Sequence, residues 1–258
     1  MIKSIVLARK DVSSNFYSWL GILIFSVFFL AAGILFALVV VKYVGISMEA
    51  ARNGYQNVEG LIMTHFIFGS LFADLGLVVL CLVPLVSMRA FSEERKQQTM
   101  ELLFTYPLSD FDIVVGKFLS LIWFFALLIF PTLGYLYLFQ WLGGSFEWGP
   151  VLAGYLGLLL LGAAFLSLGL FISSLTANQV ISALLTFGLL VLLWSLEGLM
   201  GLANDPWARW LQQISPLTHF REFTFGIVDL GHVAYFVFFC LYFLFMSLRV
   251  IEARNWKG

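Results

Sequence analysis

Six apolar segments, each long enough to cross a bilayer, constrain this chain more than any other feature. A membrane-spanning helix needs about 20 predominantly apolar residues. The segments that meet this requirement lie near Trp19–Val44, Leu61–Met88, Asp112–Phe139, Val151–Ser174, Val180–Ala203 and Leu230–Leu248. No soluble domain remains between them, because the intervening segments are short. The sequence therefore predicts an all-α polytopic membrane protein, with residues 1–258 forming a single transmembrane domain.

The composition agrees with a membrane protein. Hydrophobic residues make up 61% of the 258 positions and charged residues only 11%, more apolar surface than a soluble protein of this size could bury. The net charge of −1 gives no indication of nucleic-acid binding. Cys81 and Cys240 lie in apolar runs, and we expect buried packing residues rather than a disulfide or metal pair. No cleavable signal peptide is apparent, since the run that begins near Trp19 is long enough to span.

Basic residues gather on one side of the predicted membrane. That side collects Lys3, Arg9, Lys10, Arg89, Arg95, Lys96, Lys117, Arg249, Arg254 and Lys257, and the other collects only Lys42, Arg52, Arg209 and Arg221. Because cytoplasmic loops carry an excess of Lys and Arg, both termini are expected in the cytoplasm. The Arg89–Lys117 loop and the Leu175–Gln179 turn share that side.

The Arg89–Lys117 loop is the longest charge-rich run in the chain. Its first part, Phe91 to Phe104, is predicted to be a short helix. Ser92 can cap this helix, and Glu93 and Glu94 follow in the first turn, where carboxylates interact favourably with the helix dipole.

Pro107 cannot continue that helix, and a new one is expected directly afterwards. Ser109 with Asp112 forms an S-x-x-D capping box that opens the next apolar run. Two spans are thus joined by a charged, partly apolar helix on one side of the bilayer. Such an element suits docking to another protein.

The N-terminal segment Met1–Asn15 is too polar to span. Ile2, Ile5 and Val6 could form a short apolar face opposite the basic residues, which predicts a cytoplasmic interfacial helix. A solvated basic tail is the alternative.

A second unusual segment, residues 204–229, precedes the last span. Asp205 can cap a helix with Pro206 at its first position. One face of that helix would carry Trp207, Trp210, Leu211 and Ile214. Pro216 ends it, and a second short helix, Leu217–Phe225, would end at Gly226. The pair predicts an extracytoplasmic cap or re-entrant hairpin, with a plain pair of interfacial helices as the alternative.

Catalytic and nucleotide-binding motifs are absent from the sequence. It contains no G-x-x-x-x-G-K-[ST], no H-E-x-x-H and no C-x-x-C. The histidines, His65, His219 and His232, are scattered and are expected to be interfacial or packing residues. We therefore predict no catalytic residue, no metal site and no cofactor bound by this chain.

Two carboxylates lie inside predicted spans. Asp74 is near the middle of the second and Glu197 toward the outer part of the fifth. An unpaired charge there costs at least ~2.5 kcal/mol on insertion scales. Each should face the bundle interior, a wet cavity or a partner chain, either as a pathway residue or as a protonated or hydrogen-bonded packing residue.

Three blocks resemble the family of ABC-2 type transporter permeases. The first comprises RAFSEER at 89–95, Thr99, ELL at 101–103, Pro107 and GK at 116–117. The second is GLFISSLT at 169–176 with NQ at 178–179. The third is SPLTHF at 215–220, Gly226, Asp229 and LRVIEAR at 248–254. This third block is most similar to the gliding-motility-associated branch and to nitrous-oxide-reductase maturation permeases.

The resemblance implies the fold of type V ABC exporters, with six spans, a cytoplasmic coupling helix and an extracytoplasmic re-entrant helix pair. It also implies a bacterial inner membrane, a second permease protomer that is identical or homologous, and two separate ABC ATPase subunits that hold ATP and Mg. Membrane lipid surrounds such a protein, an extracytoplasmic accessory protein could join it, and nucleic acid is not a partner.

The resemblance also assigns roles to residues. The coupling helix would map onto residues 91–104. Its contacts with the ATPase would come from Phe91, Glu93, Glu94, Arg95, Thr99, Met100, Glu101, Leu103 and Phe104. Within that set Met100, Leu103 and Phe104 would enter the ATPase groove. An extracytoplasmic gate would comprise Trp207, Trp210, Pro216 and Phe220.

The predicted function is a permease subunit that moves a substrate with ATP hydrolysed by another chain. One alternative is a membrane anchor or assembly protein that recruits an ATPase and transports nothing. Another is a secondary transporter or channel, which would show more midplane polar residues and broken helices. An aromatic, apolar cavity would suit lipidic or amphipathic cargo, while peptides and glycans remain open.

Overall fold

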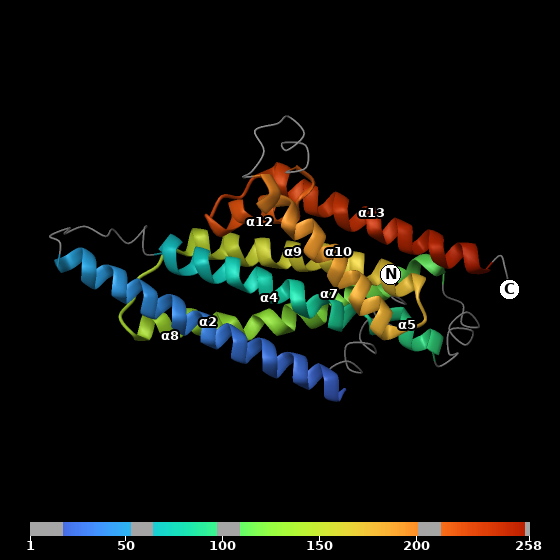
Figure 1. Ribbon diagram of the computed structural model, residues 1–258, viewed down its shortest axis with the longest axis horizontal. Helices are drawn as coiled ribbons and strands as arrows, with labels where there is room; N and C mark the ends of the chain where they lie inside the picture. Colours follow the sequence, from blue (N-terminus) through green and yellow to red (C-terminus); the bar gives the residue numbers. More distant parts are fainter. Residues whose placement is uncertain (1–17, 53–63, 97–108, 201–212, 256–258) are drawn as a thin grey trace.

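The chain folds into a bundle of long helices (Figure 1). The computed structural model describes residues 18–52, 64–96, 109–200 and 213–255. The long helices are α2 (Trp19–Arg52), α4 (Ser70–Ser87), α7 (Asp110–Ile129), α9 (Trp148–Leu175), α10 (Gln179–Met200) and α13 (Leu230–Asn255). Shorter elements are the π-helix η1 (His65–Gly69), α5 (Arg89–Lys96), the 3-10 helix η2 (Phe130–Thr132), α8 (Leu133–Trp141) and α12 (Pro216–Thr224). Within these ranges no residue is in a strand, which confirms the all-α prediction.

Among the residues that the structure describes, six helical segments are long and apolar enough to cross a membrane, as predicted. The second is continuous from η1 through α4, and the third combines α7, η2 and α8. Pro131 lies in the η2 turn between α7 and α8, where a residue without a backbone N–H is tolerated. The first helix continues to Arg52, beyond the predicted end at Val44, and the predicted end of the fifth at Ala203 lies outside the described residues.

Local signals place two helix starts. The amide of Asp112 donates to Ser109 Oγ at 3.1 Å, and that hydroxyl donates to Asp112 Oδ2 at 2.7 Å, so the predicted capping box is confirmed. The turn between α9 and α10 is also confirmed, and Asn178 Oδ1 accepts from the Val180 amide at 3.0 Å.

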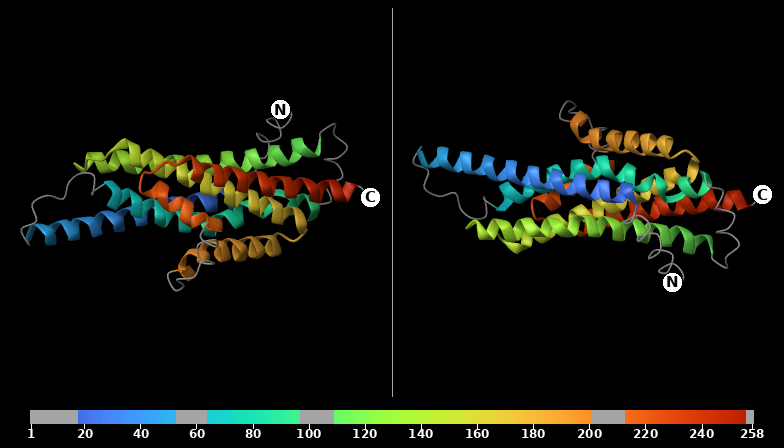
Figure 2. Two further views of the ribbon diagram at one scale, coloured as in Figure 1. Left: turned by 90° about the horizontal axis from the view of Figure 1, so that it is seen from above. Right: turned by 90° about the horizontal axis from the view of Figure 1, so that it is seen from below.

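Helix α9 is the centre of the bundle and contacts α4, α5, α7, α10, α12 and α13. In the most apolar stretch of α9, 72% is buried inside the bundle, whereas in the corresponding stretches of α10 and α13 only 17% is buried. Figure 2 shows α10 at the margin of the bundle. Two glycines of α9 permit the close packing: a Cβ at Gly162 would lie 1.9 Å from the Phe125 ring, and one at Gly169 would lie 2.1 Å from Ser87 Oγ.

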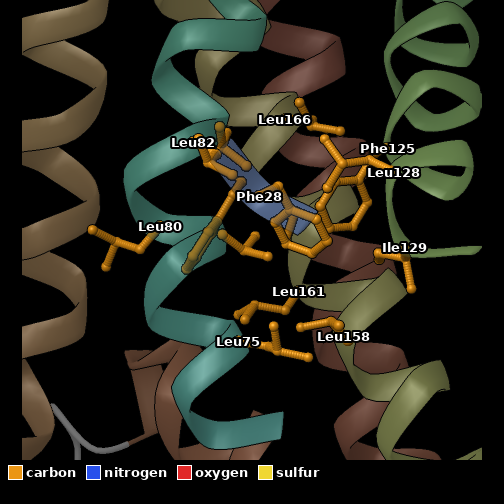
Figure 3. Close-up of a cluster of buried hydrophobic side chains, with 14 of the residues drawn as sticks. Phe28, Leu75, Leu80, Leu82, Phe125, Leu128, Ile129, Leu158, Leu161 and Leu166 are labelled. Carbon is orange, nitrogen blue, oxygen red and sulfur yellow. The ribbon is translucent and has the colours of Figure 1, made fainter. Parts of the chain in front are cut away.

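The buried core joins α2, α4, α7 and α9. Figure 3 shows Leu75 of α4 beside Leu158 and Leu161 of α9, with Phe28 and Phe125 nearby. The outer faces of α2, α10 and α13 carry many exposed aliphatic and aromatic side chains. Such surfaces are tolerated in lipid, so the chain is a multi-pass membrane protein.

The helix ends gather at two ends of the bundle. The start of α2, the end of α13, α5 and the α9–α10 turn lie at one end, which we call the α5 end (Figure 1). The chain turns between α8 and α9 at the other, the α12 end, toward which α12 lies (Figure 1). This grouping is the one predicted from the basic residues; that the α5 end faces the cytoplasm stays a prediction.

Of the remaining predictions, one is confirmed, two fall mostly outside the described residues and one was wrong. Helix α12 matches the second helix of the predicted hairpin, and Gly226 follows it with φ +80°. The first hairpin helix, apart from residues 213 and 214, and the Met1–Asn15 segment lie outside the described residues. Both cysteines are free thiols, but Cys81 is exposed on the outer face of α4, so the expectation that it is buried was wrong.

Candidate coupling site at the α5 end

Helix α5 is a direct continuation of the second span. Helix α4 ends at Ser87, Met88 forms a single turn residue, and α5 begins at Arg89. The Met88 amide donates to the Pro84 carbonyl at 3.0 Å and closes the last turn of α4, so a single residue separates the two helices. A displacement of α5 is therefore passed to α4 without an intervening loop.

The predicted cap of this helix was wrong. Because α5 begins at Arg89 rather than Phe91, Ser92 lies inside the helix and Glu93 lies beyond its first turn. The first amides of any helix lack partners within the helix. Here two of them, those of Phe91 and Ser92, donate to Ser173 Oγ of α9 at 3.0 and 3.2 Å.

Ser173 holds α5 through further bonds. Its hydroxyl donates to the Met88 carbonyl at 3.2 Å, and its carbonyl accepts from Ser92 Oγ at 3.3 Å. Both serine side chains are fully buried. The polar groups at the start of α5 are thus satisfied by α9, which fixes the helix against the centre of the bundle.

A buried ion pair joins α5 to α7. Lys117 Nζ lies 2.7 Å from Glu94 Oε1, and the two side chains are only 5% and 25% exposed. The same ammonium lies 5.1 Å from the centroid of the Phe91 ring, within cation–π range. A buried lysine is tolerated when it is paired in this way. We call Phe91, Ser92, Glu94, Lys117 and Ser173 together the α5 clamp.

A third contact ties α5 to the start of the first long helix. Arg89 Nη1 donates to Ser18 Oγ at 2.8 Å, and Arg89 Nε lies 4.0 Å from Glu93 Oε2. Helix α5 is therefore held by α4, α7, α9 and the residue that precedes α2.

The structure divides the predicted ATPase-contact residues into three groups. Phe91 is fully buried inside the chain, which leaves none of its side chain for a partner to touch, and Glu94 is engaged with Lys117. Glu93 is half-buried on α5. The backbone of Arg95 belongs to α5, while Thr99, Met100, Glu101, Leu103 and Phe104 lie outside the described residues. Their contact with an ATPase stays a prediction.

Sequence reasoning missed Lys117 and Ser173 as site residues. Lys117 was counted as a basic residue that sets orientation and as part of the first resembling block, but it was given no partner, although a lysine within a long apolar run is itself a signal of a buried partner. Ser173 was noticed within the GLFISSLT block but was given no role. Nothing local to either residue identifies its partner.

The residues predicted at the other end are placed as follows. Asp74 is exposed on the outer surface of α4, which removes the bundle interior from its alternatives. Glu197 pairs with Arg221 of α12 at 3.2 Å. Pro216 and Phe220 are buried, and Phe220 packs where a Cβ at Gly76 would lie 2.8 Å from its ring. Trp207 and Trp210 lie outside the described residues.

Two of the three histidines, His219 and His232, contact each other. His219 and His232 lie with their Nδ1 atoms 2.7 Å apart, and His219 Nε2 lies 3.0 Å from the Gln213 carbonyl. Since a carbonyl only accepts, Nε2 of His219 carries the proton and its Nδ1 accepts from His232. No three His, Cys, Asp or Glu side chains of the described residues lie close enough to share a metal ion.

Comparison with known proteins gives one family. The family model described as ABC-2 family transporter protein matches residues 5–251, a range that contains the whole α5 clamp and all of α12. No curated protein matches the chain.

Proposed function

Because this chain belongs to the ABC-2 transporter family and is thus a membrane permease component of an ABC transporter, we propose that a separate ATPase subunit drives it through α5. ATP and Mg would be bound by that subunit. The bundle would rearrange between two states when the ATPase closes and reopens, and the difference in its contacts with α5 in the two states would supply the bias.

The observation that carries this proposal is the α5 clamp. A coupling element must transmit displacement rather than absorb it, and a short helix on a flexible loop would absorb it. Helix α5 is continuous with α4, shares the Ser173 hydrogen bonds with α9 and shares the buried Lys117–Glu94 pair with α7. A force on α5 therefore acts on three spans together.

In this proposal, two faces of the predicted coupling helix have different roles. The face formed by Phe91, Ser92 and Glu94 would anchor it to the bundle. The ATPase would be met by Glu93 and Arg95 and by the residues that follow them, Thr99, Met100, Glu101, Leu103 and Phe104. This assignment revises the roles of Phe91 and Glu94 from contact residues to anchors.

The finer assignments form part of the same proposal. We place the chain in a bacterial inner membrane with the α5 end and both termini in the cytoplasm, paired with a second permease protomer of the same or a related sequence. The gliding-motility-associated branch is the proposed subgroup, and export is the proposed direction.

Charge reversal tests the ATPase contact without touching the clamp. Glu93→Lys combined with Glu101→Lys should abolish copurification of an ATPase subunit with the tagged chain from its native membrane. Glu252→Lys is the matched control, since Glu252 lies near the end of α13 and pairs only with exposed Arg249 at 2.9 Å among the described contacts. It should leave copurification intact.

Two results would overturn or narrow the proposal. If the doubly reversed variant copurifies with an ATPase and stimulates its hydrolysis as the wild type does, α5 is not the docking element. If the wild-type chain binds the ATPase and hydrolysis proceeds, but no substrate crosses the membrane of proteoliposomes that contain the complex, the chain is a membrane anchor that recruits an ATPase.

A further inference from the structure

A cavity of about 730 Å³ lies between three segments of the chain toward the α12 end. Its walls come from η1 and the start of α4, from the far end of α10, and from α12. The volume falls in the range of about 300–1,000 Å³ found for small-molecule sites. Most of the lining among the described residues is apolar and includes the aromatic side chains of Phe66, Trp194 and Phe220.

The polar side of this cavity contains groups that the protein does not satisfy. Glu197 Oε1 accepts from Arg221 Nη1 at 3.2 Å. Glu197 Oε2 and His65 Nδ1 are shielded from solvent and have no hydrogen-bond partner in the part of the chain that the structure describes. A buried polar atom without a partner is costly, and such atoms mark places where another molecule completes the bonding.

The charges of Glu197 and Arg221 indicate which chemical groups a ligand of this cavity would carry. Glu197 Oε2 is an acceptor that calls for an N–H or O–H donor. Arg221 is 63% exposed and keeps donors on the side away from Glu197, where they can meet an anion. A ligand that matches both groups carries a cationic donor and an anion a few bonds apart, attached to an apolar body for the aromatic wall.

We propose that this cavity binds an aminophospholipid of the surrounding membrane. Its primary ammonium would donate to Glu197, its phosphate would accept from Arg221 with His65 beside it, and its acyl chains would lie against Phe66 and Trp194. Two of the three walls belong to membrane-spanning segments, so a lipid can enter without leaving the bilayer. The site is toward the opposite end from α5 and does not depend on the ATPase assignment.

Lipid binding by the purified full-length chain tests the proposal. Native mass spectrometry of the detergent-solubilised protein, titrated with lipids of matched acyl chains, should give at least fivefold tighter binding of phosphatidylethanolamine than of phosphatidylcholine or phosphatidylglycerol. The choline headgroup has no N–H to donate to Glu197, and the glycerol headgroup has no cation. Bromine-labelled phosphatidylethanolamine should also quench a share of the fluorescence that is missing in Trp194→Phe.

Two variants that each remove one charge separate the headgroup contacts. Glu197→Gln removes the negative charge at constant shape, and we expect it to weaken phosphatidylethanolamine binding about tenfold and to abolish the preference over phosphatidylcholine. Arg221→Gln should weaken both phospholipids to the same extent. Glu147→Gln is the control, because Glu147 is exposed at the start of α9 and its side chain makes no capping hydrogen bond.

The proposal fails if the wild-type chain binds the three lipids equally. It also fails if Glu197→Gln keeps the preference for phosphatidylethanolamine while unfolding at the same temperature as the control. Loss of the preference in Glu147→Gln as well would show that the effect is not specific to the cavity, and would likewise overturn the assignment.

Discussion

The two ends of the bundle each join a short helix to a membrane span by an acid–base pair, and the pairs differ in their surroundings. At the α5 end, Lys117 and Glu94 are 5% and 25% exposed, and the neighbouring serines satisfy the helix start. At the α12 end, Arg221 and Glu197 are 63% and 21% exposed, so the two pairs differ in the exposure of the base and not of the carboxylate. The first arrangement fixes a helix, and the second leaves polar groups available to a ligand.

Removing Lys117, the buried partner of Glu94, should cause the largest loss of stability. Lys117→Met would leave Glu94 beside Phe91 without its cation, and we expect a loss of about 3–5 kcal/mol in the free energy of unfolding, because an uncompensated buried charge is costly. The double variant Lys117→Met with Glu94→Leu should recover most of that loss. Thermal unfolding in detergent measures both, and equal stability of the single and double variants would contradict the pair's burial.

The sequence could predict where α5 lies between two spans but not which residues of other helices hold it. The spans follow from long apolar runs, and the Ser109–Asp112 box was readable because both residues belong to the same turn. Ser92 was expected to cap its own helix, whereas the acceptor comes from Ser173, 81 residues away. Glu94 was expected to face an ATPase, whereas it meets Lys117, 23 residues away. Such partners depend on how helices pack.

The position of Asp74 could not be predicted either, because it too depends on how the helices pack. Helix α4 is apolar on all sides, so no periodicity in the sequence shows which face is buried, and the structure places Asp74 on the exposed one. Glu197 was correctly singled out as an ionisable residue in a span, but Arg221 was read only as an outward-facing charge. The pair forms because α12 folds back onto the end of α10.

Loss of the hydrogen bonds to Ser173 should cause the second largest loss of stability. Ser173→Ala removes the acceptor of two buried amides, and we expect about 1–3 kcal/mol of destabilisation, the cost of leaving such donors unpaired. Hydrogen exchange of Phe91 and Ser92 should accelerate. Ser195→Ala is the control, because Ser195 is exposed and, among the described residues, bonds only to the Leu192 carbonyl of its own helix. Unchanged exchange in Ser173→Ala would show that α5 is held without this contact.

Breaking the pair at the α12 end should cost little stability. Arg221→Met removes a cation that is itself 63% exposed and screened by solvent, and an ion pair with such an exposed partner contributes about 0–1 kcal/mol. Thermal unfolding should therefore shift far less than in Lys117→Met. A shift of equal size would mean that the two pairs are equivalent and that the contrast between the ends is mistaken.

The smallest effect we expect is a pH-dependent loosening of α12. Burial, and to a lesser extent neighbouring His232, lowers the pKa of His219, while the hydrogen bond to Gln213 acts in the opposite direction. The unfolded chain, with an ordinary histidine pKa of about 6.5, therefore binds this proton more readily than the folded one as the pH falls. By linkage, the contribution of His219 is fully present above about pH 6.5 and declines below it.

The molecular reason is that protonated His219 can no longer accept from His232 Nδ1, which lies 2.7 Å away. Hydrogen exchange along α12, corrected for the intrinsic effect of pH, should be faster at pH 5.5 than at pH 7.5. His219→Phe can retain the stacking on Tyr235, whose ring centroid lies 3.9 Å away, but carries no titrating group, so its corrected exchange should not change with pH. Equal corrected exchange of the wild type at both pH values would show that this histidine pair does not hold α12 in place.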